Sequence, residues 1–263
     1  TWARRRGRFG VERRHEHQLK SVSGRRRIVR NRRMEVLENE IEREPVGGRD
    51  VVLTLNSDWQ KHAERLLDEA LTDAPQRLLP VANELAPQPI PKGGSIVIMD
   101  VVTGRLLVAA CAPRFDLSLF TGSSPEDWEI ANADKRHPFF HRVTSMALPP
   151  GSVMKPFTAA AAIESRMLDP DAPFACQGFL KDPDEHRCLI FRLHGSGHGD
   201  VTLTQAIAQS CNVYFFDAAQ RMGFAPLRAW CDHFGFGRVT GVDLPFERSG
   251  SVPGSVVSQP GNV

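Results

Sequence analysis

The chain has 263 residues, and its hydrophobic fraction of 41% is that of an ordinary folded protein. The formal net charge of +2 excludes a chain that is strongly acidic or strongly basic overall. No apolar run reaches the length needed to cross a bilayer, so these residues contain no spanning segment. The length suits one large domain or two small ones.

The first 44 residues carry charge of two signs in separate runs. Most of the basic residues come first: Arg4, Arg5, Arg6, Arg8, Arg13, Arg14, Lys20, Arg25, Arg26, Arg27, Arg30, Arg32 and Arg33. Most of the acidic residues follow: Glu35, Glu38, Glu40, Glu42 and Glu44. A basic run can bind nucleic acid or anionic lipid, but zinc-finger spacing is absent and few aromatic residues are interleaved. The pattern indicates instead a solvated surface whose charges pair with each other, and we expect no nucleic-acid partner.

The next stretch predicts a linker, a strand, a helix and a loop. Residues 45–48, Pro-Val-Gly-Gly, are typical of a linker. Residues 51–55 are apolar and predict a short strand. Residues 56–58 predict the cap of a helix. The apolar face of that helix is Trp59, Ala63, Leu66, Leu67 and Ala70. Residues 72–91 contain five prolines and predict an irregular loop.

Two further runs predict a hairpin. Residues 96–101 and 105–111 have strand character and are separated by a turn at Thr103 and Gly104. They would form part of an antiparallel sheet, with helices that begin near Ser152 and Thr202 packed beside it. Helices against a sheet, without βαβ alternation, predict the α+β class.

The segment around Ser152 carries the strongest chemical signal. Ser152 follows the Pro-Pro-Gly break at 149–151, and Lys155 lies one helical turn further along. If a helix begins at the break, the lysine amine can reach the serine hydroxyl and act as its base. A capping serine beside a solvated lysine is the plain alternative. The alanine-rich apolar run at 157–168 argues against it, because burial lowers the pKa of a lysine, as a general base requires.

A second pair of polar residues lies between two segments with helical patterns. Ser210 and Asn212 lie between the patterns at 203–208 and 213–222. A hydroxyl and a carboxamide at such a junction can point into one cleft, where the hydroxyl relays a proton and the amide holds a substrate backbone. Local capping hydrogen bonds are the alternative interpretation. The Ser-x-x-Lys motif that precedes these residues in the sequence favours the catalytic interpretation.

The five cysteines fall into two groups. Those expected to be small buried residues are Cys111, Cys211 and Cys231. Cys176 and Cys188 bracket a polar loop instead. The histidines near that loop are His186, His194 and His198. The bracketing pair can form a disulfide in an oxidising compartment, bind zinc together with a histidine, or remain free thiols, and the spacing does not decide among the three.

Together, the motifs between roughly Asp50 and Pro253 resemble the transpeptidase domain of class B penicillin-binding proteins. Ser-x-x-Lys with Ser-x-Asn is known from penicillin-binding proteins and class A β-lactamases. The matching stretches are 94–100 with Thr103, Gly104 and Ala109; 149–156; 197–199 with 210–216; and 234–237 with Thr240, Gly241, Leu244, Pro245, Glu247 and Gly250. The third of these resembles the elongation-type subgroup more than the division-type one.

This resemblance implies the penicillin-binding/β-lactamase-like transpeptidase fold, an α+β fold with helices packed on an antiparallel sheet. Residues 1–48 would end a non-catalytic pedestal domain of dimerisation type, with Glu12 as a structural anchor, and residues 49–263 would form the transpeptidase domain. The third family motif, Lys-Thr-Gly, does not occur after Asn212. We therefore expect an internal fragment that lacks the C-terminal strands and acylates poorly without that motif.

The resemblance also implies a reaction and its residues. The reaction is D,D-transpeptidation, in which a serine enzyme cross-links peptidoglycan stem peptides through an acyl-enzyme that β-lactams also form. Ser152 would be the nucleophile, Lys155 its general base, Ser210 the proton shuttle and Asn212 the substrate-binding residue. The reaction needs no metal and no organic cofactor.

Partners and location follow from the same resemblance. The partners would be peptidoglycan stem peptides, β-lactams and cell-wall synthesis proteins such as a glycosyltransferase. A membrane-anchored parent protein would hold this part at the periplasmic face of the bacterial inner membrane. A β-lactam-sensing or β-lactamase-like domain is one alternative, against which the pedestal-like start argues. A non-catalytic cell-wall scaffold is the other, favoured if the parent also lacks Lys-Thr-Gly.

Overall fold

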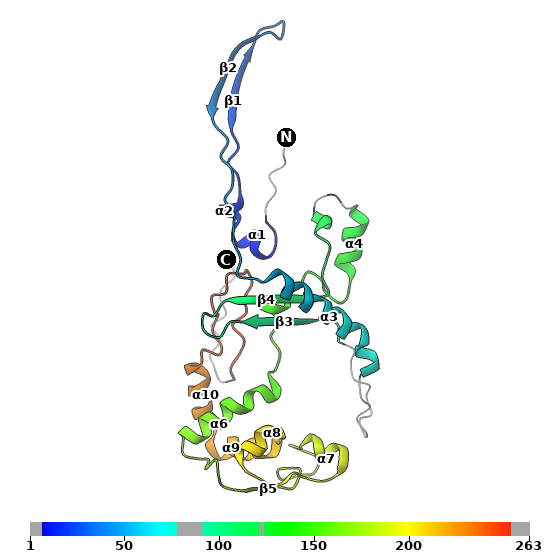
Figure 1. Ribbon diagram of the computed structural model, residues 1–263, viewed down its shortest axis with the longest axis vertical. Coiled ribbons are helices and arrows are strands. Elements are labelled where there is room, and N and C mark those ends of the chain that lie inside the picture. Colours follow the sequence, from blue (N-terminus) through cyan, green and yellow to red (C-terminus); the bar gives the residue numbers. More distant parts are fainter. Residues whose placement is uncertain (1–6, 78–90, 121, 123, 254–263) are drawn as a thin grey trace. The chain divides into compact units, whose positions relative to one another are not determined.

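The computed structural model describes residues 7–77, 91–120, 122 and 124–253 (Figure 1). Contacts between residues divide the chain into two compact units. The first comprises Thr1–Leu67, Gly94–Ser145 and Gly241–Glu247, and the second comprises Asp68–Gly93, Met146–Thr240 and Arg248–Val263. Each unit has buried apolar residues of its own.

A two-stranded ribbon carries the charged start of the chain (Figure 1). The elements of this part are α1 (Gly10–Arg14), α2 (Glu16–Leu19), β1 (Arg25–Arg30) and β2 (Val36–Arg43). In the antiparallel register Arg27 lies opposite Glu40, and Arg25 forms an ion pair with Glu42 at 2.9 Å. All residues of β2 are exposed. The predicted solvated, self-pairing charged surface is therefore confirmed.

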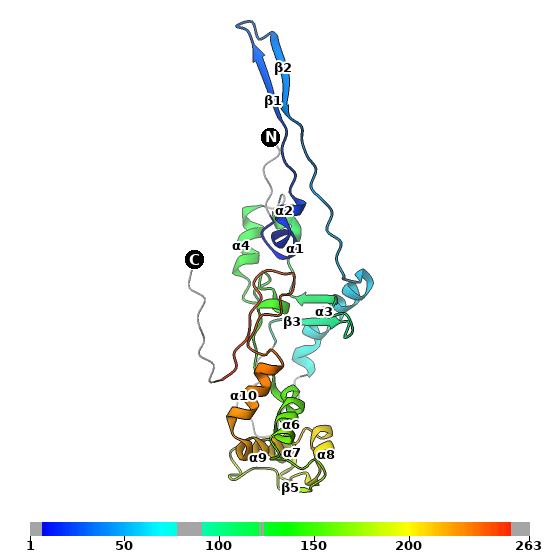
Figure 2. The same ribbon diagram turned by 90° about the vertical axis from the view of Figure 1, so that its left-hand side faces the viewer.

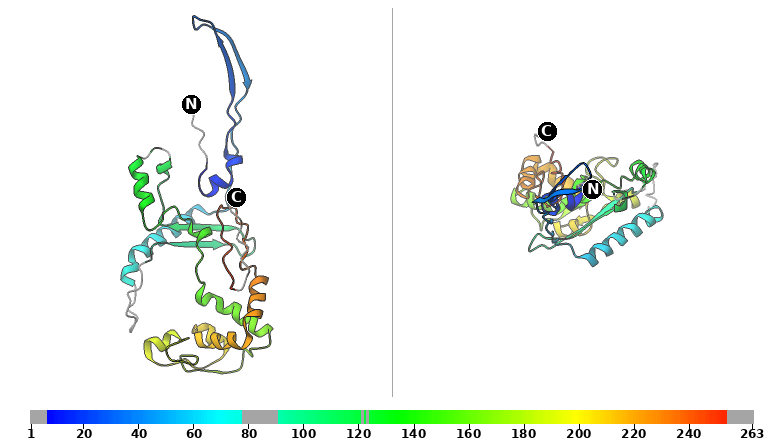
Figure 3. Two further views of the ribbon diagram at one scale, coloured as in Figure 1. Left: turned by 180° about the vertical axis from the view of Figure 1, so that it is seen from behind. Right: turned by 90° about the horizontal axis from the view of Figure 1, so that it is seen from above.

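A second hairpin lies in the first unit, as predicted (Figure 3). Its strands are β3 (Gly94–Met99) and β4 (Leu106–Ala112). From Val108 onward every second residue of β4 is fully buried, namely Val108, Ala110 and Ala112. This alternation is that of a strand with one face in a core. The helix α3 (Ser57–Arg77) begins where predicted, because the side-chain oxygen of Asn56 accepts hydrogen bonds from the backbone N–H groups of Asp58 and Trp59 at 3.1 and 3.0 Å.

Two predicted elements of this stretch are wrong. Residues 51–55 do not form a strand, and Val52 is 94% exposed. The first hydrogen bonds to β4 come from the hydroxyl of Thr54, which donates to the carbonyl of Leu106 at 2.5 Å, and from the backbone N–H of Asn56, which donates to the carbonyl of Leu107 at 2.9 Å. The predicted loop at 72–91 is helical as far as Arg77, because α3 continues through Thr72. The rest of that predicted loop, at 78–90, lies outside the described residues.

Aromatic side chains form a second centre of packing in the first unit. The helical elements here are η1 (Leu117–Phe120), α4 (Pro125–Ala133) and α5 (Arg142–Ser145). Five rings form what we call the aromatic cluster, in which each ring has at least two neighbours with centroids 4.9 to 6.1 Å away: Phe9, Phe115, Phe120, Trp128 and Phe139. Trp128 and Phe139 therefore have a packing role.

The second unit is mainly helical (Figure 2). Its elements are η2 (Gly151–Met154), α6 (Lys155–Glu164), β5 (Phe174–Cys176), α7 (Leu189–His194), β6 (Gly199–Val201), α8 (Leu203–Ala208), α9 (Asn212–Met222) and α10 (Phe224–His233). The helices predicted at 203–208 and 213–222 are confirmed. Small residues of α6, Ala159, Ala161 and Ala162, are buried where α6 packs against α9 and α10. The strands β5 and β6 pair antiparallel beside these helices.

Within the described ranges the strands form three two-stranded antiparallel sheets, β1-β2, β3-β4 and β5-β6. Helices pack beside such sheets in both units, as the α+β prediction requires. Of the helices that the structure describes, none combines the length and the apolar character needed to traverse a lipid bilayer.

Gly197 offers a test of the close packing in the second unit. A Cβ atom added there would collide with the backbone carbonyl oxygen of Cys176, whereas one added at Gly47 would meet nothing within 4 Å. We expect Gly197→Ala to lower the free energy of unfolding by about 1–3 kcal/mol, because backbone cannot yield as a side chain can. Gly47→Ala is the matched control. Urea denaturation measures both, and equal midpoints would contradict the packing described for Gly197.

Candidate active site

Ser152 lies in a single 3-10 turn that leads into a helix. Gly151 begins η2 with φ +62, a left-handed conformation that glycine adopts without steric cost, and the chain then turns directly into α6. The helix predicted at the Pro-Gly break therefore starts as this tighter turn. Ser152 is exposed, and its Oγ accepts a hydrogen bond from the hydroxyl of Ser210 at 3.1 Å. The candidate nucleophile is thus open to solvent on one side and joined to a second hydroxyl on the other.

Lys155 is the first residue of α6, and its side chain is 9% exposed. Its Nζ donates three hydrogen bonds: to the carbonyl oxygen of Ser210 at 2.6 Å, to the hydroxyl oxygen of Ser210 at 2.8 Å, and to Oδ1 of Asn212 at 2.8 Å. The amine that was predicted to be buried is buried, and each of its three donors has an oxygen partner. This arrangement places Lys155, Ser210 and Asn212 in one hydrogen-bonded group.

Burial lowers the pKa of Lys155 from the ordinary lysine value of 10.5, because an ammonium ion loses solvation in the interior. The nearby thiols of Cys211 and Cys188 act in the opposite direction on the pKa of Lys155, but desolvation is the largest cause and sets the direction. The ring of Phe215 has its centroid 5.7 Å from Nζ, where it can stabilise an ammonium ion. The lysine therefore gives up its proton more readily than an exposed lysine, as a general base must.

The described contacts differ from the direct Ser152–Lys155 contact predicted from sequence. Within the described residues, the hydrogen bonds of Nζ go to Ser210 and Asn212, and Ser210 in turn contacts Ser152. When Lys155 is neutral it has two N–H donors and one lone pair. Two donors can stay on the carbonyl of Ser210 and on Asn212, and the lone pair can then accept the hydroxyl proton of Ser210. The proton of Ser152 thus has a path to the amine through one intervening hydroxyl.

Ser210 and Asn212 belong to the predicted helix–helix junction. Ser210 has φ +53, an uncommon left-handed conformation for a residue other than glycine. Asn212 begins α9; its Nδ2 donates to the carbonyl oxygen of Arg187 at 3.0 Å while its Oδ1 accepts from Lys155. The contact with Arg187 was not foreseen, because a backbone carbonyl leaves no signal in the sequence.

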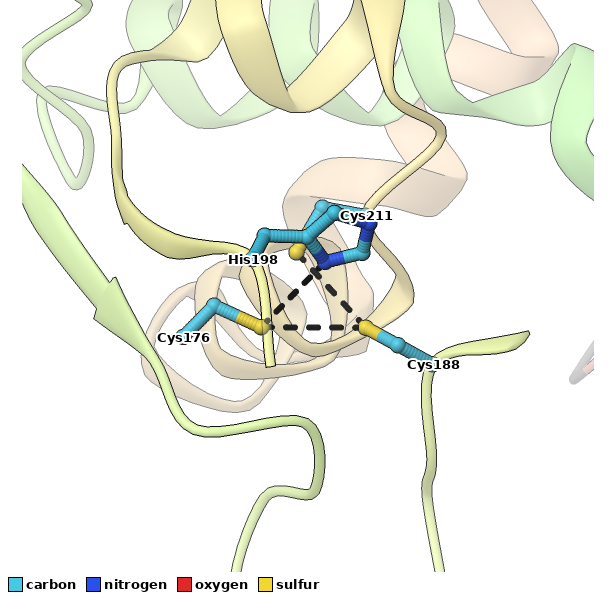
Figure 4. Close-up of side chains that lie close together, drawn as sticks. All are labelled: Cys176, Cys188, His198 and Cys211. Carbon is cyan, nitrogen blue, oxygen red and sulfur yellow. Dashed lines mark hydrogen bonds between the residues drawn. The ribbon is translucent and has the colours of Figure 1, made fainter. Parts of the chain in front are cut away.

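A cluster of sulfur and nitrogen ligands lies beside this junction (Figure 4). It consists of Cys176, Cys188, His198 and Cys211, which we call the Cys–His cluster, and its ligand atoms all lie within 4.8 Å of one another. The Sγ atoms of Cys176 and Cys188 are 3.8 Å apart, too far for a disulfide, whose S–S bond is about 2.0 Å. The three cysteines are 0–3% exposed. Burial raises the pKa of Cys188 and of Cys211.

The spacing of the Cys–His cluster matches a tetrahedral zinc site. With Zn–S bonds of about 2.3 Å and Zn–N bonds of about 2.0–2.1 Å, tetrahedral ligands lie about 3.8 Å apart for two sulfurs and about 3.6 Å apart for sulfur and nitrogen. The observed Sγ–Sγ distances are 3.8 Å for Cys176–Cys188 and 3.7 Å for Cys188–Cys211, and Cys176 Sγ lies 3.5 Å from His198 Nδ1. Three thiolates and an imidazole are a common structural zinc set, so the residues present fit this metal.

Sequence reasoning assigned these cysteines only in part. Cys211 and Cys231 are buried as predicted, but Cys111 is only partly buried, because it faces outward on β4 between two buried alanines. Zinc was one of three possibilities left open for Cys176 and Cys188, with one of the nearby histidines. The structure shows that His198 is the histidine of this set and that Cys211 belongs to it as well. The position of Cys211 within the Ser-x-Asn motif gave no indication that its thiol lies beside Cys188.

Comparisons with known proteins agree with the motifs. The family described as "Penicillin binding protein transpeptidase domain" matches residues 94–260. The peptidoglycan D,D-transpeptidase MrdA of Haemophilus influenzae is 29% identical over 249 residues, covering 94% of this chain and 35% of the relative. The chain therefore spans about a third of the length of this curated relative.

Two solved structures are similar in fold. The Pseudomonas aeruginosa PBP2 in complex with WCK 5153 has a TM-score of 0.68 at 27% identity, covering 94% of this chain and 47% of that one. A structure described as "Structural coordination of polymerization and crosslinking by a peptidoglycan synthase complex" contains a chain with a TM-score of 0.74 at 30% identity, covering 90% of this chain and 41% of that one. The predicted fold and resemblance are confirmed: the chain belongs to the penicillin-binding protein transpeptidase domain family.

Proposed function

We propose that the protein to which this chain belongs is a serine D,D-transpeptidase that cross-links peptidoglycan stem peptides, of the elongation type. The observation that carries the proposal is the hydrogen-bonded row Ser152–Ser210–Lys155, which joins an exposed hydroxyl to a buried amine of lowered pKa. A relative with 29% identity over 94% of this chain is named a peptidoglycan D,D-transpeptidase, in support of the same activity.

Acylation begins when neutral Lys155 takes the hydroxyl proton of Ser210, which takes that of Ser152. The Oγ of Ser152 attacks the carbonyl carbon of the penultimate D-alanine, and backbone N–H groups, including that of Ser152, stabilise the oxyanion. Collapse breaks the bond to the terminal D-alanine, whose amine nitrogen takes the proton back from Lys155 through Ser210. An amine of a neighbouring stem then attacks the ester and restores the Ser152 hydroxyl.

Asn212 serves two partners in this scheme. Its Oδ1 accepts from Lys155, which orients the amine toward Ser210. Its Nδ2 carries two N–H donors, and one of them is bound to the carbonyl of Arg187. The second donor can hold a backbone carbonyl of the stem peptide. Asn212 therefore fits both a positioning and a substrate-binding role.

The proposal extends to the whole protein. β-Lactams would acylate Ser152 in place of the stem peptide, and a glycosyltransferase that polymerises glycan strands is the expected partner. The domain would work at the periplasmic face of the inner membrane on a membrane-anchored protein, with residues 1–48 as the end of a pedestal. The hydroxyl–amine row argues against a purely non-catalytic scaffold.

A second proposed function, structural zinc binding, has its own observation. Three of the distances between ligand atoms of the Cys–His cluster are those of a tetrahedral site, all four atoms lie within 4.8 Å of one another, and Cys188 and Cys211 are fully buried. A bound zinc ion would supply folding free energy to the second unit, because the unfolded chain offers no preformed site. Catalysis would not pass through the metal in this scheme.

Covalent labelling tests the nucleophile and the base. We expect a fluorescent penicillin to label the full-length protein at Ser152, as located by peptide mass spectrometry, and Ser152→Ala to abolish the labelling. Lys155→Met should slow acylation by about 10²–10⁴-fold, because general-base catalysis is lost. Lys181→Met, which changes an exposed lysine of the same unit, is the control. Labelling at another residue, or normal acylation by Lys155→Met, would contradict the assignment.

The pH dependence of acylation tests the protonation state of Lys155. Only the neutral amine can accept a proton, and its lowered pKa increases the neutral fraction at any pH below 10.5. The acylation rate constant should therefore rise with pH and level off below 10.5. Lys155→Arg keeps the positive charge and should remove this limb together with the activity. A rate that goes on rising past the ordinary lysine pKa would refute a depressed pKa.

Native mass spectrometry tests the zinc proposal. We expect one zinc ion per chain, with three thiol protons displaced, and loss of the metal in Cys188→Ser, because a serine hydroxyl is a much poorer zinc ligand. Cys231→Ser changes a buried cysteine outside the Cys–His cluster and should keep the metal. A protein that binds no zinc at micromolar concentrations of the ion would refute this second proposal.

A further inference from the structure

Cys211 joins the Cys–His cluster to the candidate active site. It stands between Ser210 and Asn212, whose side chains both contact Lys155, yet its own thiol is fully buried in the Cys–His cluster. Neighbouring residues of an extended segment point to opposite sides, and Cys211 has φ −63 and ψ 110. One short segment therefore serves both sites at once.

A second link runs through Cys188. The residue before it, Arg187, offers the carbonyl oxygen that accepts from Nδ2 of Asn212 at 3.0 Å. The Sγ of Cys188 also accepts a hydrogen bond from the backbone N–H of Val213 at 3.4 Å. Cys188 and Cys211 are thus each adjacent in sequence to a residue that belongs to the hydrogen-bond network of Lys155.

The other side of the Cys–His cluster is held by a small sheet. Cys176 of β5 pairs with Gly199 of β6, next to His198, and the backbone N–H of Cys188 donates to the carbonyl of Gly178 at 2.8 Å. Three of the four ligands therefore belong to one lobe, residues 174–201. Cys211 is the single ligand from the Ser-x-Asn segment, so a metal ion in the Cys–His cluster would clamp this segment to the lobe.

The backbone of the Ser-x-Asn segment, residues 210–212, has a conformation that its surroundings must stabilise. Ser210 has φ +53, and a left-handed conformation at a residue other than glycine costs about 1–3 kcal/mol unless its surroundings hold it. The backbone bonds that hold it are Ser210 N to Ile207 O at 3.1 Å and Cys211 N to Ala206 O at 2.8 Å. A free thiol adds only weak hydrogen bonds, whereas a thiolate bound to zinc has a fixed position.

We propose that Cys211 and Cys188 are positioning residues for the acylation step: metal bound by the Cys–His cluster holds Ser210 and Asn212 where they can serve Lys155. This inference rests on both functions proposed above, the transpeptidase and the zinc site. It assigns the metal no contact with substrate. Loss of metal should slow the covalent step while the rest of the second unit stays folded.

The experiment compares the full-length protein as zinc-loaded, chelator-stripped and zinc-restored samples. Stopped-flow mixing with a fluorescent penicillin separates the dissociation constant of the encounter complex from the rate constant of acylation. We expect stripping to lower the acylation rate constant at least tenfold and restored zinc to recover it. Hydrogen exchange in a peptide covering residues 209–216 should rise on stripping, while near-UV circular dichroism stays close to that of the loaded protein.

Variants keep the inference testable if stripping unfolds the chain. His198→Ala removes the one nitrogen ligand and should weaken metal binding with less damage to the buried core, since His198 is only partly buried. Cys211→Asp keeps a zinc ligand and should acylate faster than Cys211→Ala. Cys231→Ser is the matched control and should behave as the unmodified protein, because it lies outside the Cys–His cluster.

Each failure has its own signature. No zinc by native mass spectrometry would overturn the metal site and, with it, this inference. Absence of labelling at Ser152 in the zinc-loaded protein would overturn the transpeptidase proposal, and the exchange data would still report on the clamp. An unchanged acylation rate constant in a folded, stripped protein would overturn the positioning role and leave both other proposals standing.

Discussion

The site depends on one buried amine that is held among three oxygen atoms. Lys155 is 9% exposed, and its Nζ binds two oxygens of Ser210 and one of Asn212. A buried ammonium without partners would be very costly, so these contacts decide where the amine can lie. The small residues of α6 make the burial possible, because they let α9 and α10 approach closely. Helix packing and acid–base chemistry are therefore set by the same residues.

Much of this site could be predicted from spacing alone. A serine and a lysine three residues apart must share a helical face, and an alanine-rich run must be buried, so the positions of Ser152 and Lys155 follow from local rules. The relay through Ser210 could not be predicted, since it depends on how a junction 55 residues further along folds back onto α6. Local patterns carry no information on that return.

The same limit explains the errors elsewhere in the chain. Residues 51–55 are apolar, but a strand needs hydrogen-bonding partners along its length, and here the chain meets β4 only at the end of the segment. The Cys–His cluster shows the reverse case. Its members are separated by 12, 10 and 13 residues in the sequence, intervals without a recognisable zinc motif, and the pairing of β5 with β6 brings them together.

The aromatic cluster bears on how the chain can be divided. Phe9 packs against rings from residues 115–139, and the imidazole of His15 contacts the carboxylate of Asp243 at 2.6 Å. The first helices therefore share a packing centre with segments far beyond residues 45–48. A protein shortened to begin after that stretch would present bare phenylalanine faces to water and tend to self-associate. Expression trials that seek a minimal catalytic piece should keep the first helices.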